Sequence, residues 1–234
     1  MKRAKNAERR LESAAKEKAL LLKNVERVDG LKLSPLHHHA ARLLTLSDAA
    51  PCYSGKAVCA PVSLEITPGE RIALAGGNGA GKSSLLRLLA GEKQDYTGTL
   101  TRASGLVVSY VPQCTDGLAG GLRTFAEGVD YSLFLTVLRK LGLNRMQFEK
   151  DMAGFSAGQK KKVLLARSLC EQAHLYLWDE PLNYMDLDSR MQIEQLLAEF
   201  QPTIVFVEHD AAFADAIATR TLALTAVSGA RPSR

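Results

Sequence analysis

The chain has 234 residues, of which 46% are hydrophobic, and its formal net charge at pH 7 is +5. This length can bury the core of one sizeable domain, and no run approaches the roughly 18 consecutive apolar residues of a membrane-spanning helix. The start, Met1–Lys5, lacks the apolar region of a signal peptide, and the four cysteines lack metal-ligand spacing. We therefore expect a cytoplasmic protein with unpaired thiols and no direct membrane insertion.

The positive charge is concentrated at the N-terminal end. Residues 1–45 hold eleven Lys or Arg and five Asp or Glu, a net charge of +6, whereas the rest of the chain has a net charge of −1. A basic segment in front of a nearly neutral domain favours contact with nucleic acid or another anionic surface. The alternative is a solvated helix face without a partner.

Residues 1–41 are predicted to be a basic helical linker arm. Lys, Arg, Glu and Ala dominate from residue 4 to residue 28, without Pro or Gly, and Asp29-Gly30 is expected to end the helix. A narrow apolar seam that needs a partner helix is formed by Leu11, Ala14, Leu21, Val25 and Val28. Residues 31–41 include three adjacent histidines at 37–39 and are expected to be an exposed linker, because consecutive side chains cannot all face one metal ion.

The globular domain is predicted to span residues 42–227, with a disordered tail at 228–234. Early antiparallel strands are expected at 43–46 and 57–66, and later strands at 71–75, 107–111, 174–178, 203–207 and 220–224. Helices are expected at 82–90, 131–143, 157–170 and 187–200, with Ser156 as an N-cap. Strands that alternate with helices predict an α/β sandwich with a parallel core sheet.

A glycine-rich loop between the strand at 71–75 and the helix at 82–90 is typical of a phosphate-binding P-loop. The predicted nucleotide-binding residues of this region are Gly76, Gly77, Asn78, Gly79, Ala80, Gly81, Lys82, Ser83 and Ser84. Glycines let backbone N–H groups surround a phosphate, and the helix N-terminus adds partial positive charge. Lys82 is expected to reach the β- and γ-phosphates, and the Ser83 hydroxyl to bind Mg²⁺.

Two carboxylates follow the apolar strand at 174–178. Asp179 stands where a strand beside the P-loop strand ends, so it is placed to hold Mg²⁺ through water. Glu180 can polarise the attacking water as a general base. The pair therefore predicts hydrolysis at the phosphate that the P-loop binds.

These motifs, in this order, resemble the ATP-binding cassette (ABC) ATPase family. Ser156, Ala157, Gly158 and Gln159 look like the signature loop of the family, which binds the γ-phosphate of ATP held by an opposite cassette. The resemblance implies ATP and Mg²⁺ as cofactors, ATP hydrolysis that requires a second cassette, and a P-loop fold with an antiparallel β subdomain and a small helical subdomain. Ala157 departs from the glycine of most members and adds a methyl group close to the phosphate, but Gly158 remains, so function is expected to be retained.

The same resemblance implies roles for four further parts of the chain. Gln113 matches the glutamine that contacts Mg²⁺ and the attacking water, and His209 matches the switch histidine at the γ-phosphate. Tyr53 stands where the family places an aromatic ring that stacks on adenine, and Leu182–Asp186 matches the D-loop.

Within the family, the chain is similar to the C-terminal half of an ABC-F protein. Gln113 and Ser156 are only 43 positions apart, which leaves a compact helical subdomain, and a basic arm precedes the cassette. The blocks at 155–163 and 178–184 resemble ABC-F proteins that protect ribosomes from lincosamide, streptogramin A and pleuromutilin antibiotics. The resemblance covers residues 1–227 and implies ribosomal RNA contact through residues 1–41, with either an N-terminal half or a second copy as the second cassette.

Two alternatives remain open from the sequence. Instead of a ribosome-binding ABC-F cassette, the chain could be the ATP-binding subunit of a membrane ABC transporter for drug efflux. It could also be a truncated half-protein with weak ATPase activity on its own.

Overall fold

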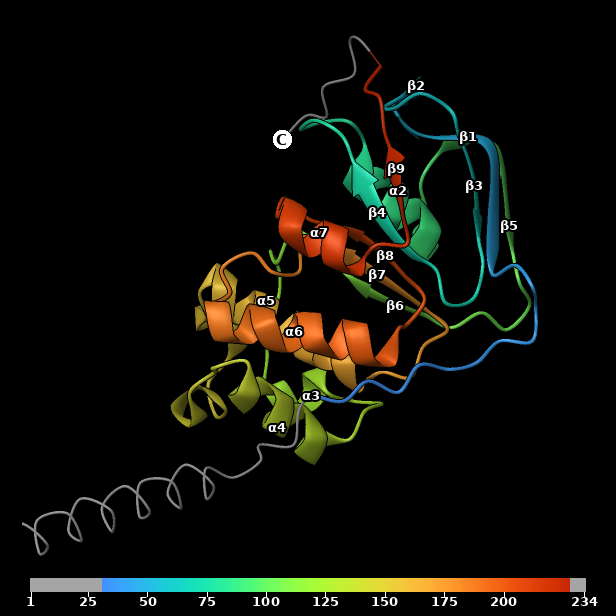
Figure 1. Cartoon of the computed structure of the whole chain (residues 1–234). Helices are drawn as coiled ribbons and strands as arrows, with labels where there is room; N and C mark the ends of the chain where they lie inside the picture. Colours follow the sequence, from blue (N-terminus) through green and yellow to red (C-terminus); the bar gives the residue numbers. More distant parts are fainter. Residues whose placement is uncertain (1–30, 228–234) are drawn as a thin grey trace, which may run out of the picture. The chain divides into compact units, whose positions relative to one another are not determined.

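A computed structural model describes residues 31–227, so the predicted arm helix at 4–28 and the predicted tail at 228–234 lie outside the described residues. The described part contains a five-stranded parallel sheet in the order β6-β7-β8-β4-β9 (Figure 1). Its strands are β4 (Arg71–Ala75), β6 (Val108–Val111), β7 (Leu175–Asp179), β8 (Ile204–Val207) and β9 (Arg220–Ala223). Every residue of β7 and β8 is buried, which explains their continuous apolar sequences.

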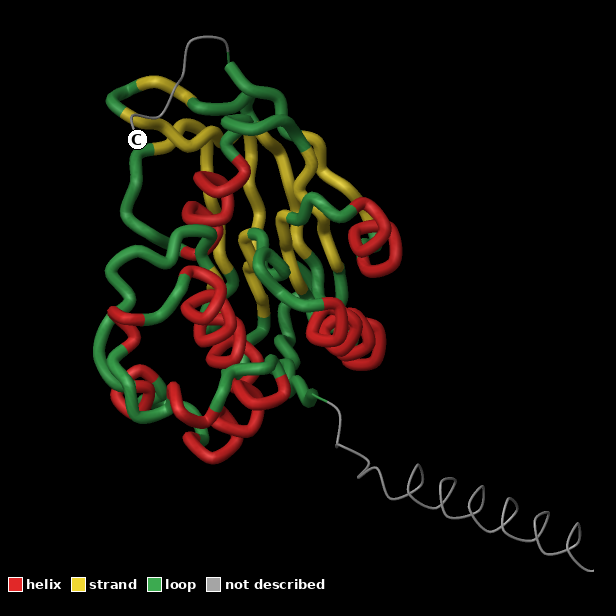
Figure 2. Tube along the Cα trace, turned by 90° about the vertical axis from the view of Figure 1, so that its left-hand side faces the viewer, coloured by secondary structure: helices red, strands yellow, loops and turns green. Residues whose placement is uncertain are grey.

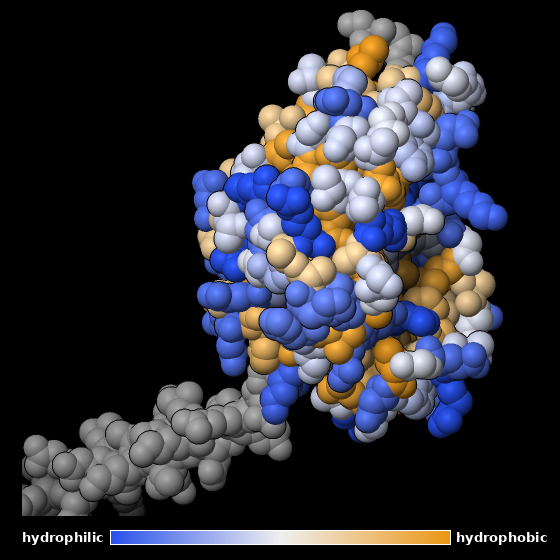
Figure 3. All heavy atoms as spheres, turned by 90° about the vertical axis from the view of Figure 1, so that its right-hand side faces the viewer, coloured by the Kyte–Doolittle hydropathy of each residue, from blue (hydrophilic) through white to orange (hydrophobic). Residues whose placement is uncertain are grey.

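A second, antiparallel sheet is built around β1 (Leu44–Tyr53). It pairs with β2 (Lys56–Ala57), β3 (Val62–Ile66) and β5 (Tyr96–Arg102). The sequence analysis did not predict β5, because its residues are exposed or half-buried and show no apolar alternation. Hydrogen bonds to β1 define this strand. The side of the molecule on which this sheet lies mixes hydrophilic and apolar side chains (Figure 3).

Helices cover both faces of the parallel sheet (Figure 2). α2 (Lys82–Ala90) packs between the two sheets, where its leucines share one core with β1 and β7. The opposite face carries α5 (Ala157–Cys170), α6 (Leu187–Phe200) and α7 (Ala211–Ile217). The predicted helices at 82–90, 157–170 and 187–200 and the predicted α/β sandwich are confirmed. No helix of residues 31–227 is long and apolar enough to cross a membrane.

Short helices between β6 and α5 form the small helical part of the domain. They are α3 (Leu122–Phe125), α4 (Tyr131–Lys140), and the 3-10 turns η1 (Arg145–Gln147) and η2 (Met152–Gly154). Phe134, Val137 and Leu138 of α4 are buried in the same core as the buried face of α5. This packing supports the start of α5, where the sequence analysis predicts the signature loop.

The segment before β1 packs on the domain. Leu31 and Leu33 are buried in the core, and the N–H of Leu36 donates to the carbonyl of Ala173 at 2.8 Å. His38 is also buried, and its Nε2 lies 3.1 Å from the carbonyl oxygen of Ser104. The sequence analysis placed residues 31–41 in a helical arm with an exposed linker, whereas the structure shows a non-helical stretch whose position depends on distant residues.

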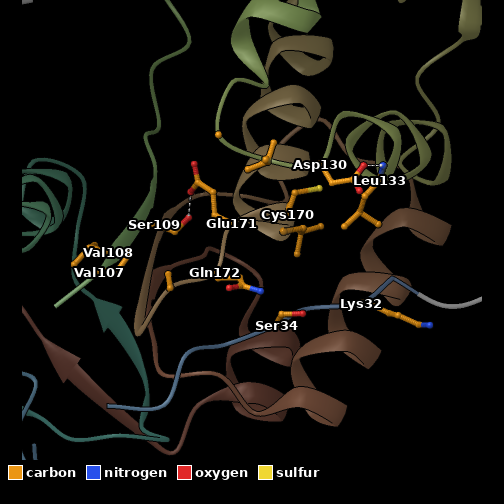
Figure 4. A pocket seen from close by; sticks show the side chains of 14 residues that line it. Lys32, Ser34, Val107, Val108, Ser109, Asp130, Leu133, Cys170, Glu171 and Gln172 are labelled. Atoms are coloured by element: carbon orange, nitrogen blue, oxygen red, sulfur yellow. Dashed lines mark hydrogen bonds between the residues drawn. The ribbon is translucent and has the colours of Figure 1, made fainter. Parts of the chain in front are cut away.

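This segment borders a pocket of about 600 Å³ on the side of β6 where that strand begins (Figure 4). The lining includes Lys32, Ser34, Val107, Asp130 and Cys170. Inside it the Ser109 hydroxyl donates to the Glu171 carboxylate at 2.6 Å, and burial raises the pKa of the Cys170 thiol to about 12. The pocket contains none of the residues predicted to bind nucleotide.

Replacing Leu33 by alanine is expected to lower the free energy of unfolding by about 2–5 kcal/mol, because the change leaves a cavity in the core. Chemical denaturation measures this loss. Leu187→Ala is the matched control, since Leu187 is 72% exposed and its truncation is expected to cost less than about 0.5 kcal/mol. Equal, small losses for both variants would show that residues 31–41 are not part of the folded unit.

Candidate functional site

The P-loop connects β4 to α2 and has the geometry of an anion cradle. Gly76 has φ +145°, and a Cβ there would lie 2.6 Å from the carbonyl oxygen of Leu224, so only glycine fits. The N-cap of α2 is Gly81, which offers no side chain to occupy the first N–H groups of the helix. These donors and the helix dipole favour a phosphate.

Lys82 supplies the positive charge of this cradle. Its Nζ donates to the carbonyl oxygens of Gly76 at 2.8 Å and Gly77 at 3.1 Å, so the side chain folds back over the loop. The ammonium group therefore lies beside the cradle, and a phosphate is a stronger acceptor than either carbonyl.

Asp179, the last residue of β7, is almost fully buried, and neither of its carboxylate oxygens has a hydrogen-bond partner among the described residues. Burial raises the pKa of this carboxyl, an effect that the nearby Ser83 hydroxyl and Lys161 ammonium partly offset. A buried carboxylate without a partner is costly unless a cation or water completes it. The residues present thus fit a Mg²⁺ ion, with Asp179 and Ser83 as its protein-side groups.

Three side chains contact the Glu180 carboxylate. Its Oε1 accepts from Gln113 Nε2 at 2.8 Å and lies 3.1 Å from His209 Nε2, and its Oε2 accepts from Asn183. The Ser83 hydroxyl lies 3.4 Å from Gln113 Oε1, which joins this group to the P-loop. The structure therefore brings together Gln113, Glu180 and His209, which lie far apart in the sequence.

The backbone of Glu180 is in the left-handed region, with φ +50°. This conformation costs a residue with a side chain about 1–2 kcal/mol, and such strain concentrates at functional sites. The N–H of Glu180 donates to the Val207 carbonyl at 2.9 Å, which holds the turn on the sheet. The turn aims the carboxylate at Gln113 and His209.

A pocket of about 300 Å³ joins these parts. Its lining includes Tyr53, the residues from Asn78 to Ser84, Gln113 and Glu180. The Tyr53 hydroxyl is 3.1 Å from Arg87 Nη1 and 3.4 Å from Ser84 Oγ, so the ring lies at the start of α2. Phosphate donors, a cation site and an aromatic ring in one pocket suit a nucleoside triphosphate.

Residues 156–159, which the sequence analysis predicts to be the signature loop, do not line this pocket. Ser156 caps α5 as predicted: its hydroxyl accepts from the N–H of Gln159, whose side chain accepts from the N–H of Ser156. Ser156 and Ala157 are exposed. At Gly158 a Cβ would lie 2.9 Å from the Cβ of Tyr184, so the retained glycine permits close packing against the segment at 182–186.

Sequence reasoning did not foresee the contact of Asn183, a residue of the predicted D-loop, with Glu180, and it missed Lys161 altogether. Asn183 contacts Glu180 from three residues further along the chain, and this short spacing after the acidic pair was an available signal. Lys161 is buried behind the site, and its place between two charged neighbours in the sequence gave no sign of burial.

Comparisons with known proteins identify the family of the chain. Residues 59–183 match the family model described as ABC transporter. The chain is 33% identical over 178 residues to the ATP-binding protein Uup of Caulobacter vibrioides, covering 71% of this chain and 29% of Uup. It is 34% identical over 170 residues to the putative ATP-binding protein YdiF of Bacillus subtilis, covering 70% of this chain and 26% of YdiF. The chain thus spans less than a third of the length of these relatives.

Solved structures show the same fold. The archaeal ribosome recycling factor aABCE1, in complex with the stalk protein aP1, has a TM-score of 0.62 at 25% identity, covering 84% of this chain and 40% of that chain. An ATP-binding subunit of an ABC transporter has a TM-score of 0.63 at 23% identity, covering 78% and 86%, a likeness that supports the fold alone.

Proposed function

Because the chain belongs to the ABC transporter family, whose members are built around an ATP-binding cassette, we propose that it binds and hydrolyses ATP as the C-terminal cassette of an ABC-F protein that acts on the ribosome. The observation that carries the ATPase part is the convergence of Gln113 and His209 on Glu180, beside the orphaned carboxylate of Asp179. Gln113 and Glu180 line the same pocket as the phosphate cradle, whereas the larger pocket beside β6 contains neither of them.

We propose a role for each residue of the site. The N–H groups of Gly76–Ser83 and the Lys82 ammonium hold the phosphates, Tyr53 supports the adenine, and Ser84 completes the pocket. Bound Mg²⁺ neutralises charge on the phosphate oxygens, and its protein-side groups are Ser83, Gln113 and, through water, Asp179. Glu180 takes the proton of the attacking water as ATP becomes ADP and phosphate, while His209 orients the γ-phosphate.

We further propose that a second cassette completes the site. Ser156–Gln159 stand outside the pocket of their own chain, so they are available to ATP held by another cassette. Tyr184 is 73% exposed and Leu187 72% exposed, an unusual exposure for large apolar side chains next to a site. The N-terminal half of a longer protein or a second copy of this chain would cover them.

The ribosome is the proposed target, with protection from antibiotics as the proposed outcome and the cytoplasm as the compartment. The net charge of +6 in residues 1–45 supports binding to RNA phosphates, which needs no base readout. The likeness to a solved ribosome recycling factor also supports a ribosomal target.

Cosedimentation with ribosomes tests the proposal. The chain, supplied with an N-terminal cassette, is expected to pellet with ribosomes when ATP is present. Glu180→Gln is expected to increase the bound fraction several-fold, because blocked hydrolysis prolongs the ATP state. Raising salt is expected to weaken the binding steeply. Lys82→Ala is the control that should not respond to ATP.

If neither the wild type nor the Glu180→Gln variant is found in the ribosome pellet, the ribosome proposal is contradicted. Copurification with a membrane permease instead would support the transporter alternative. An ATPase rate that does not depend on protein concentration would argue against the need for a second cassette.

A further inference from the structure

Lys161 lies in the second turn of α5 and is only 2% exposed, whereas its neighbours Lys160 and Lys162 are partly exposed. Lysine is almost never fully buried unless its ammonium group is paired. Because water does not solvate the buried Lys161 ammonium, other groups of the protein must accept its hydrogen bonds.

The Lys161 ammonium joins two backbone segments. Its Nζ donates to the carbonyl oxygen of Pro112 at 2.7 Å and to that of Asp179 at 2.6 Å. Pro112 immediately precedes Gln113, and Asp179 immediately precedes Glu180. One charged group thus holds the residues directly before the Gln113–Glu180 hydrogen bond.

The sheet itself does not hold these two segments together. The ladder between β6 and β7 ends at the pair Val111 and Trp178, one residue before Pro112 and Asp179. Proline has no N–H to extend a ladder, and Asp179 pairs with Val207 of β8 on its other side. The ammonium of Lys161 replaces the missing backbone bond at the point where the sheet opens into the site.

Two opposing electrostatic effects act on the Lys161 ammonium. Burial lowers the pKa of Lys161 to about 8, and the Asp179 and Glu180 carboxylates act in the opposite direction. Hydrogen bonds from a charged donor contribute roughly twice as much as neutral ones. The bond to the Asp179 carbonyl is buried and the bond to the Pro112 carbonyl is partly buried, which limits the access of water to the ammonium group.

We propose that Lys161 is a positioning residue for ATP hydrolysis, which fixes the backbone before Gln113 to the end of β7 so that Gln113 and Glu180 keep their 2.8 Å contact. The proposal rests on the roles proposed above for Gln113 and Glu180. It adds α5, the helix that begins with the signature loop, to the parts that determine the geometry of the reaction.

Lys161→Met tests this, because methionine keeps the length and apolar stem but removes both donors. The kcat of ATP hydrolysis is expected to fall at least about tenfold, since small displacements of catalytic groups are costly. The KM for ATP and the affinity for a fluorescent ATP analogue are expected to stay within about threefold. Hydrogen–deuterium exchange is expected to speed up at residues 113–116 and to stay unchanged in β4 and β8.

Lys161→Gln is the rescue variant. Its amide keeps two N–H donors without the charge, so kcat is expected to recover to within about threefold of wild type. Lys150→Met is the control for charge removal, because Lys150 is exposed, and no change is expected. All rates are measured on the chain paired with its second cassette.

A Lys161→Met chain that keeps kcat within twofold would overturn the proposal. Exchange that rises evenly across the domain, failure of Lys161→Gln to recover, or failure of Lys161→Met to fold would each show a purely structural role and overturn it too. The Glu180→Gln variant distinguishes failure of the proposed ATPase site from failure of the inference about Lys161. If it retains turnover, the proposed site itself fails; if only Lys161→Met retains turnover, the inference about Lys161 fails alone.

Discussion

Glu180→Gln is expected to lower the rate of ATP hydrolysis by about 10²–10⁴-fold, the usual contribution of a general base. Glutamine has the shape of glutamate, and its carbonyl oxygen can still accept the hydrogen bonds from Gln113 and His209. It cannot take a proton from water. ATP binding is therefore expected to persist, and the variant should accumulate in its ATP-bound form.

Phosphate release and binding of a fluorescent ATP analogue measure the two halves of this expectation separately. Glu149→Gln removes the same charge from an exposed position and serves as the control. A Glu180→Gln chain with turnover within threefold of wild type would show that another group acts as the base. Loss of ATP binding together with turnover would point instead to a collapse of the strained turn at Glu180.

Lys82→Ala is expected to abolish ATP binding at concentrations that saturate the wild type, and to lower turnover by about 10²–10³-fold. The ammonium now bridges the carbonyls of Gly76 and Gly77, so it acts both on the loop and on any phosphate inside it. Its removal takes away the positive charge that compensates the phosphates and loosens the loop. Both effects act against binding.

Isothermal titration with ATP and Mg²⁺ measures this loss. Lys93→Ala is the matched control, because Lys93 is exposed. Near-wild-type affinity in Lys82→Ala would contradict the P-loop assignment. A normal unfolding midpoint in the same variant would show that the defect lies in the site and not in the fold.

The sequence predicted the parts of the fold that depend on neighbouring residues. β7 and β8 have continuous apolar sequences because both of their faces are covered, and α2, α5 and α6 begin and end at the predicted positions. β5 was missed for the converse reason. It is largely exposed, so only its pairing with β1 makes it a strand.

The candidate site also has one part that local sequence predicts and one part that it does not. The P-loop could be predicted because its glycines and Lys82 are contiguous, and because the geometry of a phosphate cradle is set by consecutive backbone N–H groups. The roles predicted for Gln113 and His209 needed the resemblance to a family, since no local pattern links these positions. Only the structure shows that both side chains contact Glu180.

The sequence by itself thus determined the α/β class and the chemical identity of the groups at the phosphate cradle, because both follow from short-range pattern and spacing. The ATP-binding cassette followed from the resemblance of the ordered motifs to a family. The tertiary structure alone decided that residues 31–41 belong to the folded domain and that Lys161 bridges Pro112 and Asp179. Both depend on contacts between segments far apart in the chain, such as Leu36 with Ala173 and Lys161 with Pro112, 49 residues away. The burial of Lys161 depends on these contacts between distant segments, so the residues next to it in the sequence do not predict it.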